Sequence, residues 1–222
     1  MGALVMVIGP SGSGKSTSLR NFHEGEVGIF NTAGKPLPFR NRLKTAHRAG
    51  YDTIKRTLKA NSLNAYVIDD STYLMQFDAF RYAKVKGYDK FVDMAQDFEQ
   101  LLEAAMATDE DTIVYFLHHP QFADDGTAKP QTVGRMLDNQ LNVEGLFPIV
   151  IECKVKDGEH VFVTNGEGIA KSPMEMLPPV MGNDLREVDA LIREYWGMAP
   201  LAPKKPKGQV EDKPSTNSQE SR

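Results

Sequence analysis

The stretch Gly9-Pro10-Ser11-Gly12-Ser13-Gly14-Lys15-Ser16 matches every fixed position of the pattern G-x-x-x-x-G-K-[ST]. An unbroken apolar run of strand length, residues 3–8, precedes it, and residues 17–22 read as the first turns of a helix. A strand before the loop and a helix after it form the context in which this pattern binds phosphate. The rest of the chain is therefore interpreted around this loop.

The residue types in the loop predict that it binds a triphosphate together with Mg²⁺. Its three glycines allow the backbone to turn successive N–H groups toward the phosphate oxygens. Lys15 is expected to reach the β- and γ-phosphates, and the hydroxyl of Ser16 is expected to ligate Mg²⁺. The predicted cofactors are ATP and Mg²⁺, and the predicted nucleotide-binding residues are Gly9, Pro10, Ser11, Gly12, Ser13, Gly14, Lys15, Ser16 and Thr17.

Composition sets the broad class of the protein. The 222 residues, 41% of them hydrophobic, predict one domain over residues 1–199 and a disordered tail over residues 200–222. A single cysteine, Cys153, excludes an internal disulfide framework and a Cys-rich zinc site, which predicts a cytoplasmic setting. No apolar run approaches the length of a membrane span, and a net charge of −4 argues against non-specific coating of nucleic acid.

A second apolar run, residues 65–68, leads directly into Asp69 and Asp70. A buried strand that ends in a carboxylate is the second half of a nucleotide site, because it holds the carboxylate where Mg²⁺ binds. We assign Asp69 to the metal. Asp70 either orients the attacking water or caps the following helix, and the sequence leaves both roles open.

Two basic stretches have two readings each, as an ordinary solvated face or as a nucleic-acid contact. The first follows the second predicted strand and consists of Lys35, Arg40, Arg42, Lys44, His47 and Arg48, with Phe39 among them. The second is a turn in which Tyr82 and Tyr88 accompany Lys84, Lys86 and Lys90. Rings that stack on bases and lysines that meet phosphates suit single-stranded DNA.

Residues 112–117 form another predicted strand, and it ends at His118, His119, Pro120 and Gln121. In many ATPases with a parallel sheet, the strand between the two nucleotide-motif strands ends in a polar residue that senses the γ-phosphate. His118, His119 and Gln121 are the candidates. Residues 122–134 are too polar and too long for a simple connection, which predicts a functional or mobile loop before a helix near residues 136–143.

The remaining pattern predicts an α/β fold with a mostly parallel central sheet flanked by helices. Further strands are expected at residues 27–30, 146–152 and 160–163, the last two joined by a tight turn at Asp157-Gly158. Helices are expected at residues 51–59, 72–84, 89–107 and 184–196, the last capped by Asn183. Residues 164–173, with Lys171, read as a flexible segment.

Together, the loop, the strand that ends at Asp69-Asp70-Ser71, the His-His-Pro-Gln turn and residues 164–173 resemble short bacteriophage-encoded ATP-binding proteins with a RecA-like core. Some relatives in that group act as single-strand annealing recombinases. The resemblance implies a P-loop NTPase in a bacterial host cell and a DNA-binding loop at residues 120–134. It also implies that Lys171 reaches the nucleotide of a neighbouring subunit.

One departure from the RecA pattern affects the expected chemistry. RecA-like enzymes carry a catalytic glutamate just after the second strand, where this chain has Asn31-Thr32-Ala33-Gly34-Lys35. Either Asp70 substitutes for it, or hydrolysis is slow and the nucleotide acts mainly as a switch. No arginine is placed beside the loop in sequence, so we expect a homo-oligomer in which Lys171 or Arg135 completes the site in trans.

The expected function is an ATPase that depends on single-stranded DNA, with Lys15, Asp70, His118 and Lys171 taking part in hydrolysis. Two alternatives stay open: a P-loop kinase of a small molecule, and a DNA-annealing module that binds ATP with little hydrolysis. A kinase of this type would carry an arginine-rich lid, which residues 122–134 lack. The chain also lacks the Leu-Ser-Gly-Gly signature of transporter ATPases and the Asn-Lys-x-Asp base reader of GTPases.

Overall fold

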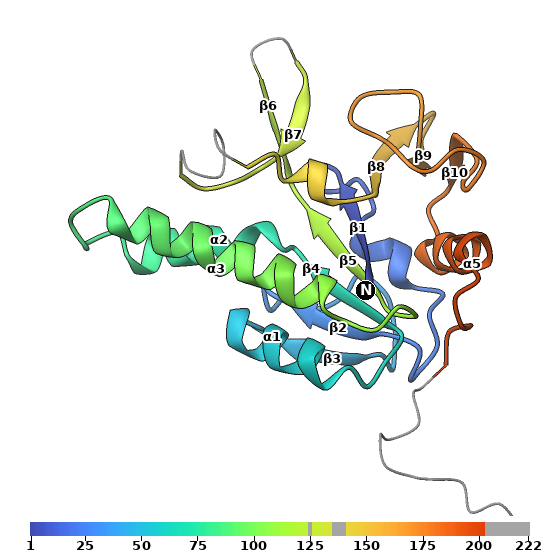
Figure 1. Ribbon diagram of the computed structural model, residues 1–222. Helices are drawn as coiled ribbons and strands as arrows, with labels where there is room; N and C mark the ends of the chain where they lie inside the picture. The colour runs from blue at the N-terminus through green and yellow to red at the C-terminus, as the bar shows by residue number, and fades with distance from the viewer. Residues whose placement is uncertain (124–125, 135–140, 203–222) are drawn as a thin grey trace, which may run out of the picture.

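An eight-stranded sheet forms the centre of the computed structural model, which describes residues 1–123, 126–134 and 141–202 (Figure 1). The strand order is β10-β9-β8-β1-β5-β4-β2-β3, and every neighbouring pair from β8 to β3 is parallel. Only β9 and β10 run antiparallel to their neighbours. The strands of this sheet are β1 (Ala3–Ile8), β2 (Gly28–Asn31), β3 (Lys44–His47), β4 (Ala65–Asp69), β5 (Ile113–His118), β8 (Ile149–Lys156), β9 (Glu159–Val163) and β10 (Val180–Gly182).

Helices cover both faces of the sheet, which confirms the predicted α/β class with a mostly parallel sheet. The helices α1 (Tyr51–Ala60), α2 (Thr72–Arg81) and α3 (Asp89–Met106) lie on one face. The other face packs against α5 (Leu185–Trp196) and the short 3₁₀ helix η1 (Ser16–Leu19). Along β1, Leu4 and Met6 enter the first core and Val5 and Val7 the second, so burial on both faces explains the uninterrupted apolar run.

The predicted helix at residues 17–22 is wrong in type and length, because the chain forms only the single 3₁₀ turn of η1. The guanidinium of Arg20 donates to the carbonyl oxygen of Thr17 at 3.2 Å and to that of Asn183 at 2.5 Å. Arg20 thereby ties this turn to the segment that precedes α5. Leu19 and Phe22 are both buried beneath this contact.

Four short strands were not predicted. Part of the first basic stretch forms β3 at the edge of the sheet, and its side chains are exposed or half-buried, so no apolar pattern marks it. Within the predicted loop, β6 (Pro120–Phe122) and β7 (Ala128–Pro130) pair as a small hairpin. The fourth is β10, which pairs with β9 at the opposite edge.

Other boundaries follow the sequence closely. The turn between β8 and β9 is the predicted one, and Asp157 (φ 53°) and Gly158 (φ 85°) both adopt the left-handed backbone of a two-residue hairpin turn. The cap of α5 is Asp184 rather than Asn183, since the Asp184 carboxylate accepts hydrogen bonds from the backbone N–H groups of Arg186 and Glu187. The predicted helix near residues 136–143 and the tail after residue 202 lie outside the described residues. The remaining short element is η2 (Glu144–Leu146).

A buried charged network joins α5 to the amino end of the sheet. Arg193 and Asp189 form an ion pair in which both side chains are almost fully buried, and Tyr115 Oη donates to Asp189 Oδ2 at 2.8 Å. Burial raises the pKa of Asp189, and the Arg193 charge opposes that rise. The same guanidinium donates at 2.8 Å to three backbone carbonyls: those of Asn64, Asp111 and Ala199.

In the described part of the chain, no helix combines the length and the apolar character that a membrane span requires.

Candidate functional site

The loop between β1 and η1 lies at the carboxyl edge of the sheet, where ligands of open parallel sheets bind. β5 pairs with β1 on one side and with β4 on the other. The strand that ends at His118 therefore lies between the two strands of the predicted nucleotide motif, as the sequence interpretation required. This arrangement brings the ends of β1 and β4 to one region of the edge.

Lys15 is the most constrained side chain of the loop. It is 5% exposed, and its Nζ donates to the carbonyl oxygens of Gly9 at 2.6 Å and Pro10 at 3.1 Å. Burial lowers the pKa of Lys15, while the nearby carboxylates of Asp70 and Asp69 oppose that decrease. Its ammonium group is bonded to carbonyls and to no carboxylate within the described residues, so its positive charge is available to an anion.

The loop backbone presents unused donors. Among the described residues, no protein acceptor receives the N–H groups of Gly12, Gly14, Lys15 or Ser16. Gly12 (φ 81°) has open space where a side chain would begin, and Gly14 (φ 103°) is backed by His160, whose ring a Cβ would approach to 3.0 Å. The loop is thus a concave run of N–H groups, the arrangement that binds anionic oxygens.

The back of the loop is fixed by strands β8 and β9. The carbonyl oxygen of Ser13 accepts from His160 Nδ1 at 2.8 Å and from the Cys153 thiol at 3.0 Å. Cys153 in turn accepts from Asn183 Nδ2 at 3.3 Å, and burial raises the pKa of its thiol to about 11. Cys153 is therefore a buried neutral group that supports the loop.

Ser16 and Asp69 meet at the opposite side of the loop from these supports. The Ser16 hydroxyl donates to Asp69 Oδ1 at 2.8 Å, across 53 residues of sequence. Burial and the adjacent Asp70 raise the pKa of Asp69 to about 6, although the Ser16 hydrogen bond opposes the increase. A buried carboxylate whose charge is poorly compensated is a suitable ligand for a divalent cation.

Asp70 has a left-handed backbone (φ 57°) and a buried carboxylate. Lys35 Nζ lies 2.6 Å from Asp70 Oδ2, and His119 Nε2 lies 3.2 Å from Asp70 Oδ1. Burial would raise the pKa of Asp70, but the contacts with His119 and Lys35 outweigh it and lower the pKa. The carboxylate is charged, and Lys35 and His119 both contact it.

His118 and His119 have different surroundings. His118 is fully buried, its Nδ1 accepts from the Ser71 hydroxyl and its Nε2 donates to the carbonyl of Gln131, both at 2.8 Å. Burial lowers the pKa of His118 to about 4, so this ring is neutral. His118 therefore joins β5 to the segment after β7, and His119 is the histidine that reaches the site.

A cavity of about 270 Å³ connects these groups. It is lined by most of the predicted loop and by Asp69 and Asp70, together with residues that the sequence interpretation did not assign to the site. The full lining is Ser11, Gly12, Gly14, Lys15, Ser16, Thr17, Lys35, Pro36, Pro38, Asp69, Asp70, His119 and His160. Gly9, Pro10 and Ser13 do not line it; their carbonyl oxygens hold Lys15 and His160 instead.

Two cavity residues were missed for different reasons. Lys35 follows β2, which pairs with β4 in parallel, so its position at the same edge could have been deduced from strand order. His160 comes from the antiparallel hairpin after β8, and only the register of that hairpin places it against the loop. Of the first basic stretch, Lys35 alone lines this cavity.

Lys171 does not line this cavity. Its backbone forms two hydrogen bonds with Val150 of β8, at 2.8 and 2.9 Å. The segment around it is attached at further points, since Ile169 N–H donates to Glu152 Oε1 at 2.8 Å and Ser172 N–H donates to Asn165 Oδ1 at 3.1 Å. These bonds anchor a segment that was predicted to be flexible. Arg135 lies outside the described residues.

The residues present fit a magnesium-bound triphosphate. The free N–H groups and the Lys15 ammonium are hydrogen-bond donors suited to phosphate oxygens. The Ser16 hydroxyl and the Asp69 carboxylate are oxygen ligands suited to Mg²⁺. Within the described ranges, no group of three or more His, Cys, Asp or Glu side chains is placed to hold a metal. Mg²⁺ fits such a site, because it usually binds one or two carboxylates and completes its shell with water and phosphate.

No protein-family model matches the sequence, and a search of curated proteins returns no significant match.

Proposed function

We propose that this protein binds ATP with Mg²⁺ in the cavity at the carboxyl edge of the sheet and hydrolyses it slowly, as a P-loop ATPase with a RecA-like core. The observation that carries the proposal is the position of Lys15. Its charge is held by the carbonyls of Gly9 and Pro10 among unused backbone N–H groups, in the cavity that Ser16 and Asp69 also line. Such an arrangement has little use except to bind a polyanion with its cation.

The chain's own residues would divide the chemistry among them. Lys15 and the loop N–H groups bind the phosphates, and Asp69 with Ser16 holds the cation, which supplies Lewis-acid polarisation of the phosphoryl oxygens when bound. Asp70 is the carboxylate proposed to accept a proton from water, but Lys35 and His119 both contact it. Because Asp70 must leave these contacts before it can act as a base, we expect ATP hydrolysis to be slow.

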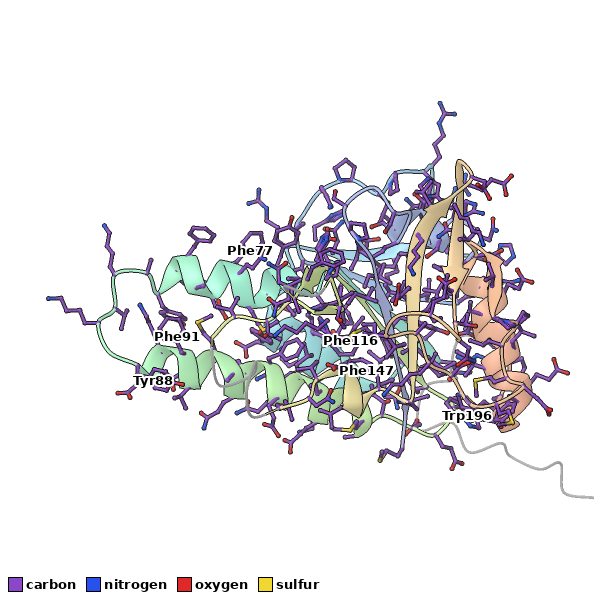
Figure 2. The ribbon with its side chains drawn as sticks, turned by 90° about the horizontal axis from the view of Figure 1, so that it is seen from above. Phe77, Tyr88, Phe91, Phe116, Phe147 and Trp196 are labelled. Atoms are coloured by element: carbon purple, nitrogen blue, oxygen red, sulfur yellow. The ribbon has the colours of Figure 1, made fainter. Side chains whose placement is uncertain are left out.

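Single-stranded DNA is the proposed partner, and the protein is proposed to act in phage recombination or strand annealing as a homo-oligomer. Support comes from the connection between helices α2 and α3, which projects from the body of the molecule (Figure 1). Figure 2 shows Tyr88 and Phe91 near that end, and Phe80 is 81% exposed. Exposed rings beside lysines suit stacking on bases and contact with phosphates. Lys171, away from its own cavity, stays available to a neighbouring subunit.

Measurement of phosphate release with Mg²⁺ and ATP, with and without a thymidine oligonucleotide, tests this function. We expect slow release of inorganic phosphate that single-stranded DNA accelerates and duplex DNA does not. ATP binding without phosphate release in either condition would instead support the annealing module that binds ATP with little hydrolysis. Absence of ATP binding would refute the proposal.

A small-molecule kinase remains the second candidate, because another cavity of about 410 Å³ lies at the same edge of the sheet. Arg48, Tyr51, Asp78 and Arg81 are among its lining residues. A cavity with cationic and acidic side chains near the proposed phosphate site could hold a phosphoryl acceptor. Measurement of ADP as well as inorganic phosphate, with candidate phosphoryl acceptors added, separates the functions: a kinase would form ADP only with an acceptor and would release no inorganic phosphate.

The two aspartates are expected to differ in their effect on the metal. Asp69→Asn should raise the Mg²⁺ concentration needed for half-maximal nucleotide binding by about tenfold or more. The reason is that the Asp69 carboxylate adjoins Ser16 at the end of a buried strand. Asp70→Asn should change that concentration less, since the Asp70 carboxylate engages Lys35 and His119. Titration of Mg²⁺ at fixed ATP measures both. Equal magnesium dependence in the wild type and Asp69→Asn would contradict the metal assignment.

A further inference from the structure

Lys35 is a cation in the cavity that the proposed chemistry has not yet used. It occupies the region after β2 and lines the same cavity as Lys15, with its Nζ 2.6 Å from Asp70 Oδ2. Lys15 and Lys35 thus bring two ammonium groups to one anion site from separate segments of the chain. The transition state of phosphoryl transfer requires added positive charge of this kind.

The two partners of this ion pair differ in their freedom to move. The Lys35 side chain is 53% exposed, whereas that of Asp70 is 3% exposed. Asp70 also has the His119 contact, which remains if Lys35 leaves. The contact between Lys35 and Asp70 is therefore one that the lysine can break while the carboxylate stays in place.

The backbone of Lys35 is fixed even though its side chain is exposed. Asn31, buried at the end of β2, donates from Nδ2 to the Lys35 carbonyl at 2.5 Å and accepts from the Gly34 N–H at 2.6 Å. Gly34 (φ 72°) makes the turn between them. Lys35 therefore has a constant reach into the cavity, and only its flexible stem must change for the ammonium to find another anion.

We propose that Lys35 distinguishes a triphosphate from a diphosphate, by exchanging its contact with Asp70 for the terminal phosphate and thereby freeing one carboxylate oxygen of Asp70, while His119 still contacts the other. The inference rests on the proposed nucleotide site and adds to it a residue of the same chain that senses the nucleotide. A terminal phosphate carries more charge than one carboxylate and accepts stronger charge-assisted hydrogen bonds, which favours the exchange. A diphosphate leaves Lys35 on Asp70, so the carboxylate stays engaged.

The test compares the binding of ADP and of a non-hydrolysable ATP analogue, both with Mg²⁺, by calorimetry. We expect Lys35→Ala to lower the ratio of analogue affinity to ADP affinity by about tenfold or more, because a charge-assisted contact is lost only with the triphosphate. The matched control is Lys154→Ala. Lys154 also forms a close ion pair, with Glu152 at 2.7 Å, but does not line the cavity. In Lys154→Ala, the ratio of analogue affinity to ADP affinity should stay within about twofold of the wild-type ratio.

A double variant separates direct contact from simple neutralisation of Asp70. If Lys35 contacts the phosphate, the ratio of analogue affinity to ADP affinity in the double variant, Lys35→Ala with Asp70→Asn, stays about tenfold below the ratio in Asp70→Asn alone. If Lys35 only neutralises Asp70, the double variant matches Asp70→Asn, and the inference is overturned. Both substitutions lie at the cavity edge, and circular dichroism checks that each protein is folded.

The remaining outcomes also decide between the claims. If the wild-type protein binds both nucleotides and Lys35→Ala keeps the wild-type ratio, this inference fails while the proposed function stands. If the wild-type protein binds neither nucleotide, the proposed function fails and this inference fails with it.

Discussion

Lys15→Ala is expected to lower the affinity for ATP by about 100-fold or more, since the Lys15 ammonium of the wild type would form charge-assisted hydrogen bonds with two phosphate groups. The wild-type loop places that charge inside the cavity and bonds it only to backbone carbonyls. No other lysine or arginine in the described part of the chain is held by the loop in this way. Calorimetry with ATP and Mg²⁺ measures the loss, and phosphate release should fall with it.

The same variant should keep its fold. Burial lowers the pKa of Lys15, which means that the folded protein disfavours this charge and gains little stability from it. We expect the melting temperature to change by less than about 3 °C. Lys44→Ala, on the exposed edge strand β3, is the control and should bind ATP normally. Unchanged ATP affinity in Lys15→Ala would show that the cavity is not the nucleotide site.

The largest expected effect on stability is that of Arg193→Met, at about 3–5 kcal/mol, because removing one member of a buried ion pair leaves the other charge uncompensated. Asp189 would remain buried with only Tyr115 as a donor, and the carbonyls of Asp111 and Ala199 would lose the guanidinium that donates to them. The free energy of unfolding in urea measures the loss. Nucleotide binding at the distant edge should survive in the fraction that is folded.

Arg186→Met is the matched control for that prediction. Arg186 also pairs with one carboxylate through two hydrogen bonds, to Glu26 at 2.8 and 2.9 Å, but its side chain is 39% exposed. Its loss should cost about 1 kcal/mol, because solvent compensates an exposed pair. Asp189→Leu added to Arg193→Met should recover part of the loss by removing the buried charge. Equal costs for Arg193→Met and Arg186→Met would contradict the explanation by burial.

Two parts of the proposed site follow from local sequence, since each depends on neighbours in the chain. The glycines of the loop allow the left-handed turns at Gly12 and Gly14, and an apolar strand that stops at Asp69 carries its carboxylate to the end of that strand. Both Ser16 and Asp69 were assigned to the metal from sequence, but their contact across 53 residues depends on the order of β1, β5 and β4. Elements with strong apolar periodicity, such as α3, were also placed within one residue of their observed ends.

Elements without such a local signal were missed. The edge strand β3 has no buried face, and the hairpin of β6 and β7 is too short for a period to be visible. The choice between His118 and His119 was equally inaccessible to sequence, because adjacent residues of a strand end point in opposite directions. Which of them meets the cavity depends on the packing of β5 against Gln131 and Ser71.

By itself, then, the sequence determined the α/β class, the concave loop at residues 9–16 and the two carboxylates after β4, because glycine conformation, strand burial and helix periodicity act over a few residues. Tertiary structure alone decided that Lys35 reaches Asp70, that His160 supports Ser13 and that Arg193 is buried on the inner face of α5. Each of these contacts joins segments whose approach depends on strand order and register. The strand order and register are the ones that give the whole core its lowest free energy. They therefore depend on residues throughout the chain, and no short stretch of sequence encodes them.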